Sequence, residues 1–186
     1  MLGSFDGEKI SLGEMHRFAN EPVILNGKDR STMYWDFLRL FHELKTGITR
    51  AGIMQGRSGA DISSIGVDTW GVDYGLLGRD GMLLSSPVHY RDSRTEGMLK
   101  KAFSRMDRER LYEITGSQFM EINTAFQLMA EQEYREELLE QAESMLLMPD
   151  LFSYFLSGEM GSEYTIASTT QMLDAVKKDW SGEVLE

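Results

Sequence analysis

The stretch from Asp68 to Asp73 is the densest group of potentially reactive side chains in the sequence. Two carboxylates, a hydroxyl and an indole fall within six positions, and Gly71 would let a ligand approach the backbone. A sugar has apolar C–H faces and a rim of hydroxyl groups, so an indole beside hydroxyl and carboxylate groups suits a sugar site. Asp68, Thr69, Trp70, Gly71 and Asp73 are therefore candidate substrate-binding residues. On residue types alone, a strand-to-turn corner with Trp70 in the core is the simpler interpretation.

A second polar cluster runs from Tyr90 to Thr95 and contains two arginines. Arginine binds phosphate or carboxylate groups through paired N–H donors, so Arg91 and Asp92 are secondary candidates. The simpler alternative is that Arg91 and Asp92 pair with each other or with neighbours at the start of a helix.

Several common catalytic motifs are missing from the sequence. It has no Gly-x-x-x-x-Gly-Lys-Ser/Thr loop, no Gly-x-Gly-x-x-Gly after a strand and no Gly-x-Ser-x-Gly elbow. Gly56-Arg57-Ser58-Gly59 comes nearest to a phosphate loop, but it precedes a predicted strand and is interpreted as a flexible connection. There is no cysteine, and the three histidines are far apart, so we expect no metal site.

The N-terminal third is predicted to combine two strands, a loop, a long helix and a third strand. Met1–Phe5 would turn at Asp6-Gly7 and return through Lys9–Phe18, and the polar residues 20–31 read as a loop. Asp36 precedes a helix whose apolar residues recur at helical spacing until residues 52–60 break it. Residues 62–68 are predicted to form a buried strand.

The rest of the chain is predicted to be mainly helical around two further strand regions. An Asp-Gly turn at residues 80–81 joins apolar runs into a hairpin. Asp107 and Asn123 are predicted helix caps, and Gly116 and Gly158 predicted helix ends. Met145–Met148 is a predicted buried strand followed by a helix from Pro149. The acidic residues between these elements predict a solvated helix face: Glu131, Glu133, Glu136, Glu137, Glu140 and Glu143.

This alternation of strands and helices predicts an α/β fold with a largely parallel central sheet, opened by an antiparallel meander. Ligands of such sheets lie at the carboxyl ends of strands, which directs attention to the residues after Val67 and after Met148. Asp150 is the polar residue there, with a helix cap as its simpler role.

The composition narrows the range of partners. The 186 residues carry 19 Lys and Arg against 30 Asp and Glu, a formal charge of −11. Without a dense basic run, we expect no binding to nucleic acid or to a membrane surface. No apolar run approaches the roughly 20 residues needed to span a bilayer, and no signal peptide is recognisable. These features and the lack of cysteine predict a cytoplasmic protein.

Four segments resemble the carbohydrate kinases that include xylulokinase and glycerol kinase, and within that family the rhamnulokinase group. They are Glu14–Phe18, Ser64–Asp73, Pro87–Thr95 and Leu147–Tyr154, and the similarity continues through Leu156–Gly158, Glu163–Thr165, Ala167–Gln171 and Trp180. The stretch Asp-Thr-Trp-Gly-Val-Asp is the most specific, because other sugar kinases of the superfamily differ there.

This resemblance implies a fold of two ribonuclease-H-like domains, as in actin and hexokinase, with ATP and sugar meeting between them. The chain would be an incomplete first domain over residues 1–186, a mixed sheet with flanking helices. It would lack the first strand with its phosphate loop and the whole second domain. The family's substrate contact falls on Gly71, whereas the general base and the ATP site fall outside the match. The chain would then hold no catalytic, cofactor-binding or metal-binding residue.

The implied reaction is transfer of the γ-phosphoryl group of ATP to the 1-hydroxyl of L-rhamnulose, with Mg²⁺ as the charge clamp. The chain alone is expected to be inactive, because phosphoryl transfer depends on positioning and electrostatics from both domains. The alternatives are a kinase for fuculose or xylulose, or a non-catalytic sugar-binding or interaction domain. A hydrolase using Asp68 and Asp73 is a weaker third alternative. Self-association through the exposed N-terminal hairpin is also expected.

Overall fold

The computed structural model describes residues 1–58 and 61–186. The chain forms two compact units, which are described separately. Unit 1 consists of Met1–Pro22 and Asp36–Gly66, and unit 2 of Val23–Trp35 and Val67–Glu186.

Unit 1 contains a hairpin and a long helix. Strands β1 (Leu2–Phe5) and β2 (Ile10–Gly13) pair antiparallel, which confirms the predicted Asp6-Gly7 turn. The Asp6 carboxylate accepts hydrogen bonds from the backbone N–H groups of Glu8 and Lys9, at 2.9 and 2.8 Å. The returning strand ends at Gly13, earlier than predicted.

Helix α1 (Phe37–Ser58) begins after Asp36 as predicted but does not break at Gly52. It continues through Gly52 and Gly56 because a glycine inside a helix costs only about 1 kcal/mol relative to alanine. The predicted connection at Gly56–Gly59 is therefore wrong for its first three residues, and Gly59 lies outside the described residues. The predicted buried strand over residues 62–68 is also wrong, because this segment forms no strand and is largely exposed.

Unit 2 begins with a hairpin where a loop was predicted. Strands β3 (Val23–Asn26) and β4 (Ser31–Tyr34) pair antiparallel around a four-residue turn. The turn closes with a hydrogen bond from the Gly27 N–H to the Arg30 carbonyl oxygen, 2.9 Å. The breakers Pro22 and Gly27 lie just outside β3, so they delimit the strand and do not prevent it.

At the centre of unit 2, β5 (Tyr74–Leu77) and β6 (Ser144–Leu147) pair antiparallel, with Tyr74 opposite Leu147. Every strand pair in the described part of the chain is antiparallel, so the expected largely parallel sheet is wrong here. The start of β5 therefore lies beside the end of β6, and the Met148 N–H donates to the Asp73 carbonyl oxygen, 3.1 Å. The predicted turn after β5 is confirmed by a bridge between Leu77 and Leu83.

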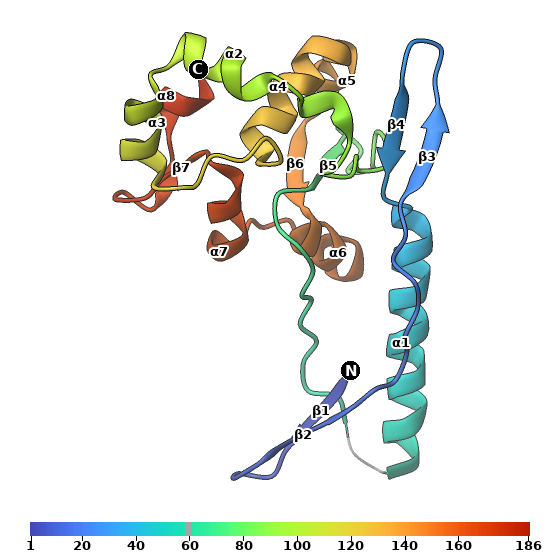
Figure 1. Ribbon diagram of the computed structural model, residues 1–186. Coiled ribbons are helices and arrows are strands. Elements are labelled where there is room, and N and C mark those ends of the chain that lie inside the picture. The colour runs from blue at the N-terminus through green and yellow to red at the C-terminus, as the bar shows by residue number, and fades with distance from the viewer. Residues whose placement is uncertain (59–60) are drawn as a thin grey trace. The chain divides into compact units, whose positions relative to one another are not determined.

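Helices surround this pair. Helix α6 (Met148–Ser157) leaves the end of β6 and packs beside both strands (Figure 1). The left-handed residues Gly116 and Gly158 end α3 (Arg108–Thr115) and α6 as predicted, with φ of 61° and 82°. The other helices of this unit are α2 (Met98–Arg105), α4 (Thr124–Tyr134), α5 (Glu136–Glu140), α7 (Tyr164–Ala167) and α8 (Gly182–Leu185), with single 3₁₀ turns η1 (Ser93–Thr95) and η2 (Ser168–Thr170).

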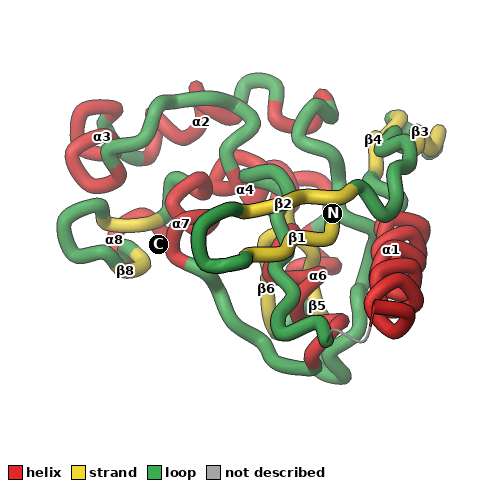
Figure 2. The backbone as a smooth tube through the Cα atoms, turned by 90° about the horizontal axis from the view of Figure 1, so that it is seen from below, coloured by secondary structure: helices red, strands yellow, loops and turns green. Residues whose placement is uncertain are grey.

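A small antiparallel pair, β7 (Leu173–Asp174) and β8 (Asp179–Trp180), lies beside α3 with α8 next to it (Figures 1 and 2). Two apolar clusters form the core of unit 2. One joins β5, β6 and α7 through Tyr74, Leu147 and Ala167, and the other joins α2, α3 and α4 through Met98, Leu111 and Phe126. Among the described residues, no helix is long and apolar enough to cross a bilayer.

Candidate functional site

The carboxylate of Asp73 is the organising group at the start of β5. It is 0% exposed, yet donors surround both of its oxygens. Its Oδ2 accepts from the indole Nε1 of Trp35 at 2.6 Å and of Trp70 at 3.0 Å. The Tyr90 backbone N–H also reaches Oδ2 at 3.3 Å, and Oδ1 accepts from Gln127 Nε2 at 3.1 Å. Burial raises the pKa of Asp73, and the donors oppose that rise because they stabilise the charged form.

Four aromatic rings are in successive contact near this carboxylate. Trp35 lies between Trp70 and His89, with ring centroids 4.2 and 4.1 Å away. His89 stacks in turn on Tyr90 at 4.5 Å. Because Asp73 hydrogen-bonds both indoles, it fixes the rotation of the rings as well as their position.

The backbone at Gly71 and Val72 runs close to η2. A Cβ atom at Gly71 would lie 3.1 Å from the side chain of Thr169, so glycine permits this approach. Val72 has a φ of 67°, which is strained for a β-branched residue. It is held there because its N–H donates to Thr169 Oγ1 at 3.1 Å and its carbonyl oxygen accepts from Thr124 Oγ1 at 2.7 Å.

A pocket of about 570 Å³ opens beside these residues. Three of the predicted site residues line it: Trp70, Gly71 and Arg91. The remaining lining mixes apolar, hydroxyl and amide groups, as a sugar would need: Val72, Tyr90, Ser117, Gln118, Met120, Ile122, Asn123, Ser168 and Thr169.

The other predicted site residues lie outside this lining. Thr69 is half-buried and donates to the Trp70 carbonyl oxygen at 3.2 Å, whereas Asp68 is exposed. Asp73 is buried and is not part of the lining, and its carboxylate holds the indole of Trp70.

Arg91 and Asp92 do not pair with each other but with neighbours at the start of η1, which is the second of the two predicted alternatives. Asp92 accepts instead from Arg30 Nη2 at 2.7 Å, from the Met33 N–H at 2.8 Å and from the Arg94 N–H at 3.0 Å. Arg91 donates through Nε to the hydroxyl of Tyr90 at 3.2 Å. Asp92 therefore connects the loop before η1 to the β3–β4 hairpin. The side chain of Arg91 lines the pocket.

Sequence reasoning missed the pocket residues that precede α4 and those of η2. Asn123 occupies the predicted cap position of α4 without a side-chain capping bond. Its amide donates instead to the Gln118 carbonyl oxygen at 2.9 Å and to Gln171 Oε1 at 2.7 Å. The available signal is the polar run Ser168–Gln171, which is part of a segment that carries the resemblance.

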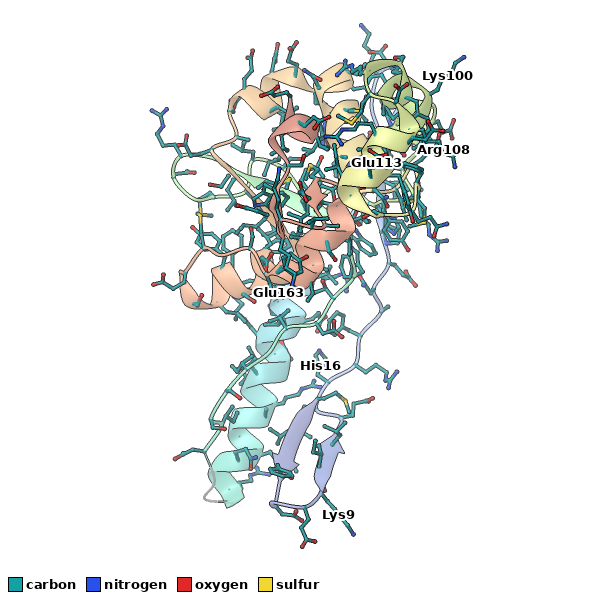
Figure 3. The ribbon with its side chains drawn as sticks, turned by 90° about the vertical axis from the view of Figure 1, so that its left-hand side faces the viewer. Lys9, His16, Lys100, Arg108, Glu113 and Glu163 are labelled. Carbon is teal, nitrogen blue, oxygen red and sulfur yellow. The ribbon has the colours of Figure 1, made fainter. Side chains whose placement is uncertain are left out.

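Two polar groups elsewhere have structural roles. Asp150, in the first turn of α6, accepts from the Glu163 N–H at 3.3 Å, and burial raises its pKa. Glu163 itself caps α7, where Figure 3 labels it. Within the described ranges, no group of three or more His, Asp or Glu side chains could hold a metal ion.

Residues 12–186 match the N-terminal domain of the FGGY family of carbohydrate kinases. Two similar proteins are the rhamnulokinases of Oceanobacillus iheyensis, 39% identical over 186 residues, and Bacteroides thetaiotaomicron, 40% identical over 186 residues. Each match covers 100% of this chain, which spans 38% and 37% of those proteins respectively.

Solved structures of sugar kinases share the fold at low sequence identity. A xylulose kinase from Rhodospirillum rubrum matches with a TM-score of 0.78 at 13% identity, over 88% of this chain and 34% of that one. A Plasmodium falciparum glycerol kinase with ADP matches with a TM-score of 0.75 at 16% identity, over 90% of this chain and 34% of that one.

Proposed function

Because the chain belongs to the FGGY family of carbohydrate kinases, we propose that it provides the sugar-binding side of a rhamnulokinase. Its fold is the mixed α/β, ribonuclease-H-like fold of these kinases. The observation that carries the proposal is the pocket lined by Trp70 and Gly71. Asp73 holds the indole of Trp70 in place at this pocket.

In the proposed reaction, the γ-phosphoryl group of ATP is transferred to the 1-hydroxyl of L-rhamnulose, with Mg²⁺ neutralising the phosphates. ADP and L-rhamnulose 1-phosphate are the products. The contribution of this chain is to hold the sugar. The indole of Trp70 offers an apolar face to its C–H groups, Gly71 lets it approach the backbone, and Arg91 offers donors to its hydroxyl groups.

The chain alone is expected to bind sugar without transferring phosphate. Among the described residues that line the pocket, none carries a carboxylate or an imidazole that could act as a general base. The base and the ATP site would come from parts of a rhamnulokinase that this chain does not cover. The reaction would take place in the cytoplasm, where ATP is supplied.

The first test is sugar binding by the 186-residue chain. Titration with L-rhamnulose, L-fuculose and D-xylulose, followed by tryptophan fluorescence, should show the tightest binding for L-rhamnulose. Trp70→Ala should abolish this binding, because the indole is the apolar face of the site, whereas Trp180→Ala, at a partly exposed indole outside the lining, should leave it intact. Tighter binding of fuculose or xylulose would reassign the substrate, and no binding would contradict a sugar site.

A second test separates a kinase domain from a non-catalytic sugar-binding domain. The chain would replace the matching part of the Oceanobacillus iheyensis rhamnulokinase, to which it is 39% identical. ADP release with L-rhamnulose by the folded chimera, and none by the chain alone, is the expected result. A folded chimera that binds the sugar without releasing ADP would favour the non-catalytic alternative.

We also propose that unit 1 supports self-association through β1 and β2. This two-stranded sheet exposes Phe5, Ile10 and Leu12, each about two-thirds or more exposed. A two-stranded sheet with an apolar surface and open edges is prone to pairing with another strand.

A further inference from the structure

A second pocket of unit 2, of about 440 Å³, lies between the β3–β4 hairpin and α4. We call it the hairpin pocket. Its volume falls within the range of small-molecule sites. Its lining shares no residue with the candidate sugar pocket, the one lined by Trp70 and Gly71: Leu25, Asn26, Gly27, Lys28, Asp29, Arg30, Thr32, Tyr34, Arg94, Ala130, Glu131, Tyr134 and Arg135.

The lining of the hairpin pocket is cationic, although the chain is acidic. Four basic residues, Lys28, Arg30, Arg94 and Arg135, face two acidic ones, Asp29 and Glu131. The lining therefore has a formal excess of two positive charges in a chain whose net charge is −11. A local field opposite to the average of the molecule attracts anions.

The buried carboxylate of the pocket is shared between two guanidinium groups. Glu131, 2% exposed and not on the solvated face expected from sequence, accepts from Arg135 Nε and Nη2 at 2.6 and 2.5 Å. The same carboxylate lies 3.6 Å from Arg94 Nη2. One negative charge therefore faces two positive ones.

Arg94 keeps spare hydrogen-bonding capacity in this setting. It is 5% exposed, and its Nη2 donates to Gln127 Oε1 at 2.6 Å. Its Nε and Nη1 form no hydrogen bond of normal geometry among the described residues, and neither does the buried hydroxyl of Tyr74, with which Arg94 interacts. A buried guanidinium without full compensation is costly, and a nearby anion would reduce that cost.

The hairpin adds two further cations. Arg30 is anchored by Asp92 at 2.7 Å and lies 4.9 Å from the ring centroid of Tyr134, while its Nε has no hydrogen-bond partner in the described structure. Lys28 is exposed in the hairpin turn and forms no ion pair within residues 1–58 and 61–186. The pocket thus has one fixed and one free cation at its hairpin side.

We propose that the hairpin pocket binds a small organic phosphate. The excess positive charge and the hydroxyl groups of Thr32 and Tyr34 suit the phosphate group. Leu25, Ala130 and the ring of Tyr134 provide an apolar surface for the organic part. The proposal does not depend on the sugar site, because the two pockets have separate linings.

Isothermal titration of the 186-residue chain with sn-glycerol 3-phosphate tests this site, with inorganic phosphate as the comparison at equal ionic strength. The ester should bind, and more tightly than inorganic phosphate. Lys28→Glu should weaken ester binding about tenfold, because it reverses a charge at the pocket without breaking an ion pair. No binding at millimolar ester would overturn the proposal, and equal affinity for inorganic phosphate would overturn its organic part.

Lys100→Glu is the matched control, since it changes the net charge equally at an exposed residue of α2 outside the pocket (Figure 3). It should leave the affinity unchanged. Thr32→Asp places a carboxylate in the lining itself and should weaken binding at least as much as Lys28→Glu, with an unchanged circular dichroism spectrum confirming the fold. An equal loss in Lys28→Glu and Lys100→Glu would show general attraction to charge and contradict a site.

Discussion

At the residue scale, the buried carboxylate of Asp73 is the group that holds the indoles of Trp35 and Trp70 beside the candidate sugar pocket. Four donors converge on it, from Trp35, Trp70, Tyr90 and Gln127. Donors from several segments hold each ring more tightly than one contact would, because displacing one ring leaves a buried acceptor partly unsatisfied.

Asp73→Asn should therefore weaken sugar binding without removing any pocket contact. The amide turns one acceptor oxygen into a donor, which then faces an indole N–H or the Gln127 amide, at a cost of about 1–3 kcal/mol. Sugar affinity and the tryptophan emission spectrum should change together. Asp107→Asn is the control, since Asp107 is exposed and makes no capping bond. Unchanged emission in Asp73→Asn would contradict the positioning role.

His89 is expected to make the stability of the folded protein depend on pH. Burial lowers the pKa of His89 below its ordinary value of 6.5, with the charge of Arg91 adding to the effect and Asp92 opposing it. The unfolded chain then binds more protons, so stability should fall as pH drops below 6.5 toward the folded pKa. Protonation would also remove the acceptor Nδ1 that holds the Arg91 N–H at 3.0 Å.

Urea unfolding on both sides of pH 6.5 measures this effect. His89→Asn keeps an acceptor near the Arg91 N–H and cannot titrate, so it should lose part of the acid sensitivity of the parent chain. His42→Asn, at a histidine in unit 1, serves as the comparison. Equal acid sensitivity in His89→Asn and the parent chain would contradict the assignment.

The sequence predicted part of this site because its signal is local. Trp70 and Gly71 stand in one short motif, and both line the pocket. The role of Asp73 was not predictable, since its donors Trp35 and Gln127 are 38 and 54 residues away in the chain. The pocket residues Ser117 and Thr169 were missed because they are far from Trp70 and Gly71 in the sequence and belong to no chemical motif.

At the element scale, the β5–β6 pair positions the site, and its packing leaves no room at Gly75. A Cβ atom there would lie 2.7 Å from the side chains of Leu83 and Leu151. Helix α6 can therefore pack directly on the strands because this position of β5 has no side chain.

Gly75→Ala should destabilise the protein by about 1–3 kcal/mol, because packed leucines must move to admit the methyl group. Gly161→Ala, where an added Cβ would meet no atom within 4 Å, should change stability little. Urea unfolding of both variants provides the measurement. Equal stability of the two variants would show that α6 adjusts freely and would contradict tight packing at Gly75.

Helix ends and short turns were predictable at this scale, because Gly116, Gly158 and Asp6-Gly7 act on their immediate neighbours. The strand pairing was not. Strands β5 and β6 are about 70 residues apart, and their direction follows from how the helices between them pack. The length of α1 was underestimated because Gly52 and Gly56 each cost the helix only about 1 kcal/mol, which does not end it.

At the scale of the whole molecule, the exposed hairpin of unit 1 should determine the state of association. Light scattering should show a mass that rises with concentration, because β1 and β2 expose apolar side chains and open edges. Phe5→Lys should reduce this rise by charging the hairpin. Val176→Lys, at an 85% exposed residue of unit 2, should not. A monomer at all concentrations would contradict the proposal.

A hydrogen-bonded chain joins the linings of the two pockets. Arg94 donates to Gln127 Oε1, and Gln127 donates through Nε2 to Asp73 Oδ1. Trp70, in the sugar pocket, donates to the other oxygen of Asp73. All of these bonds point toward the one carboxylate. A guanidinium, an amide and an indole do not exchange protons at ordinary pH, so this series of hydrogen bonds cannot conduct a proton. A ligand in one pocket would influence the other by shifting these groups, whereas the proton that the proposed phosphoryl transfer removes from the sugar must leave by another route.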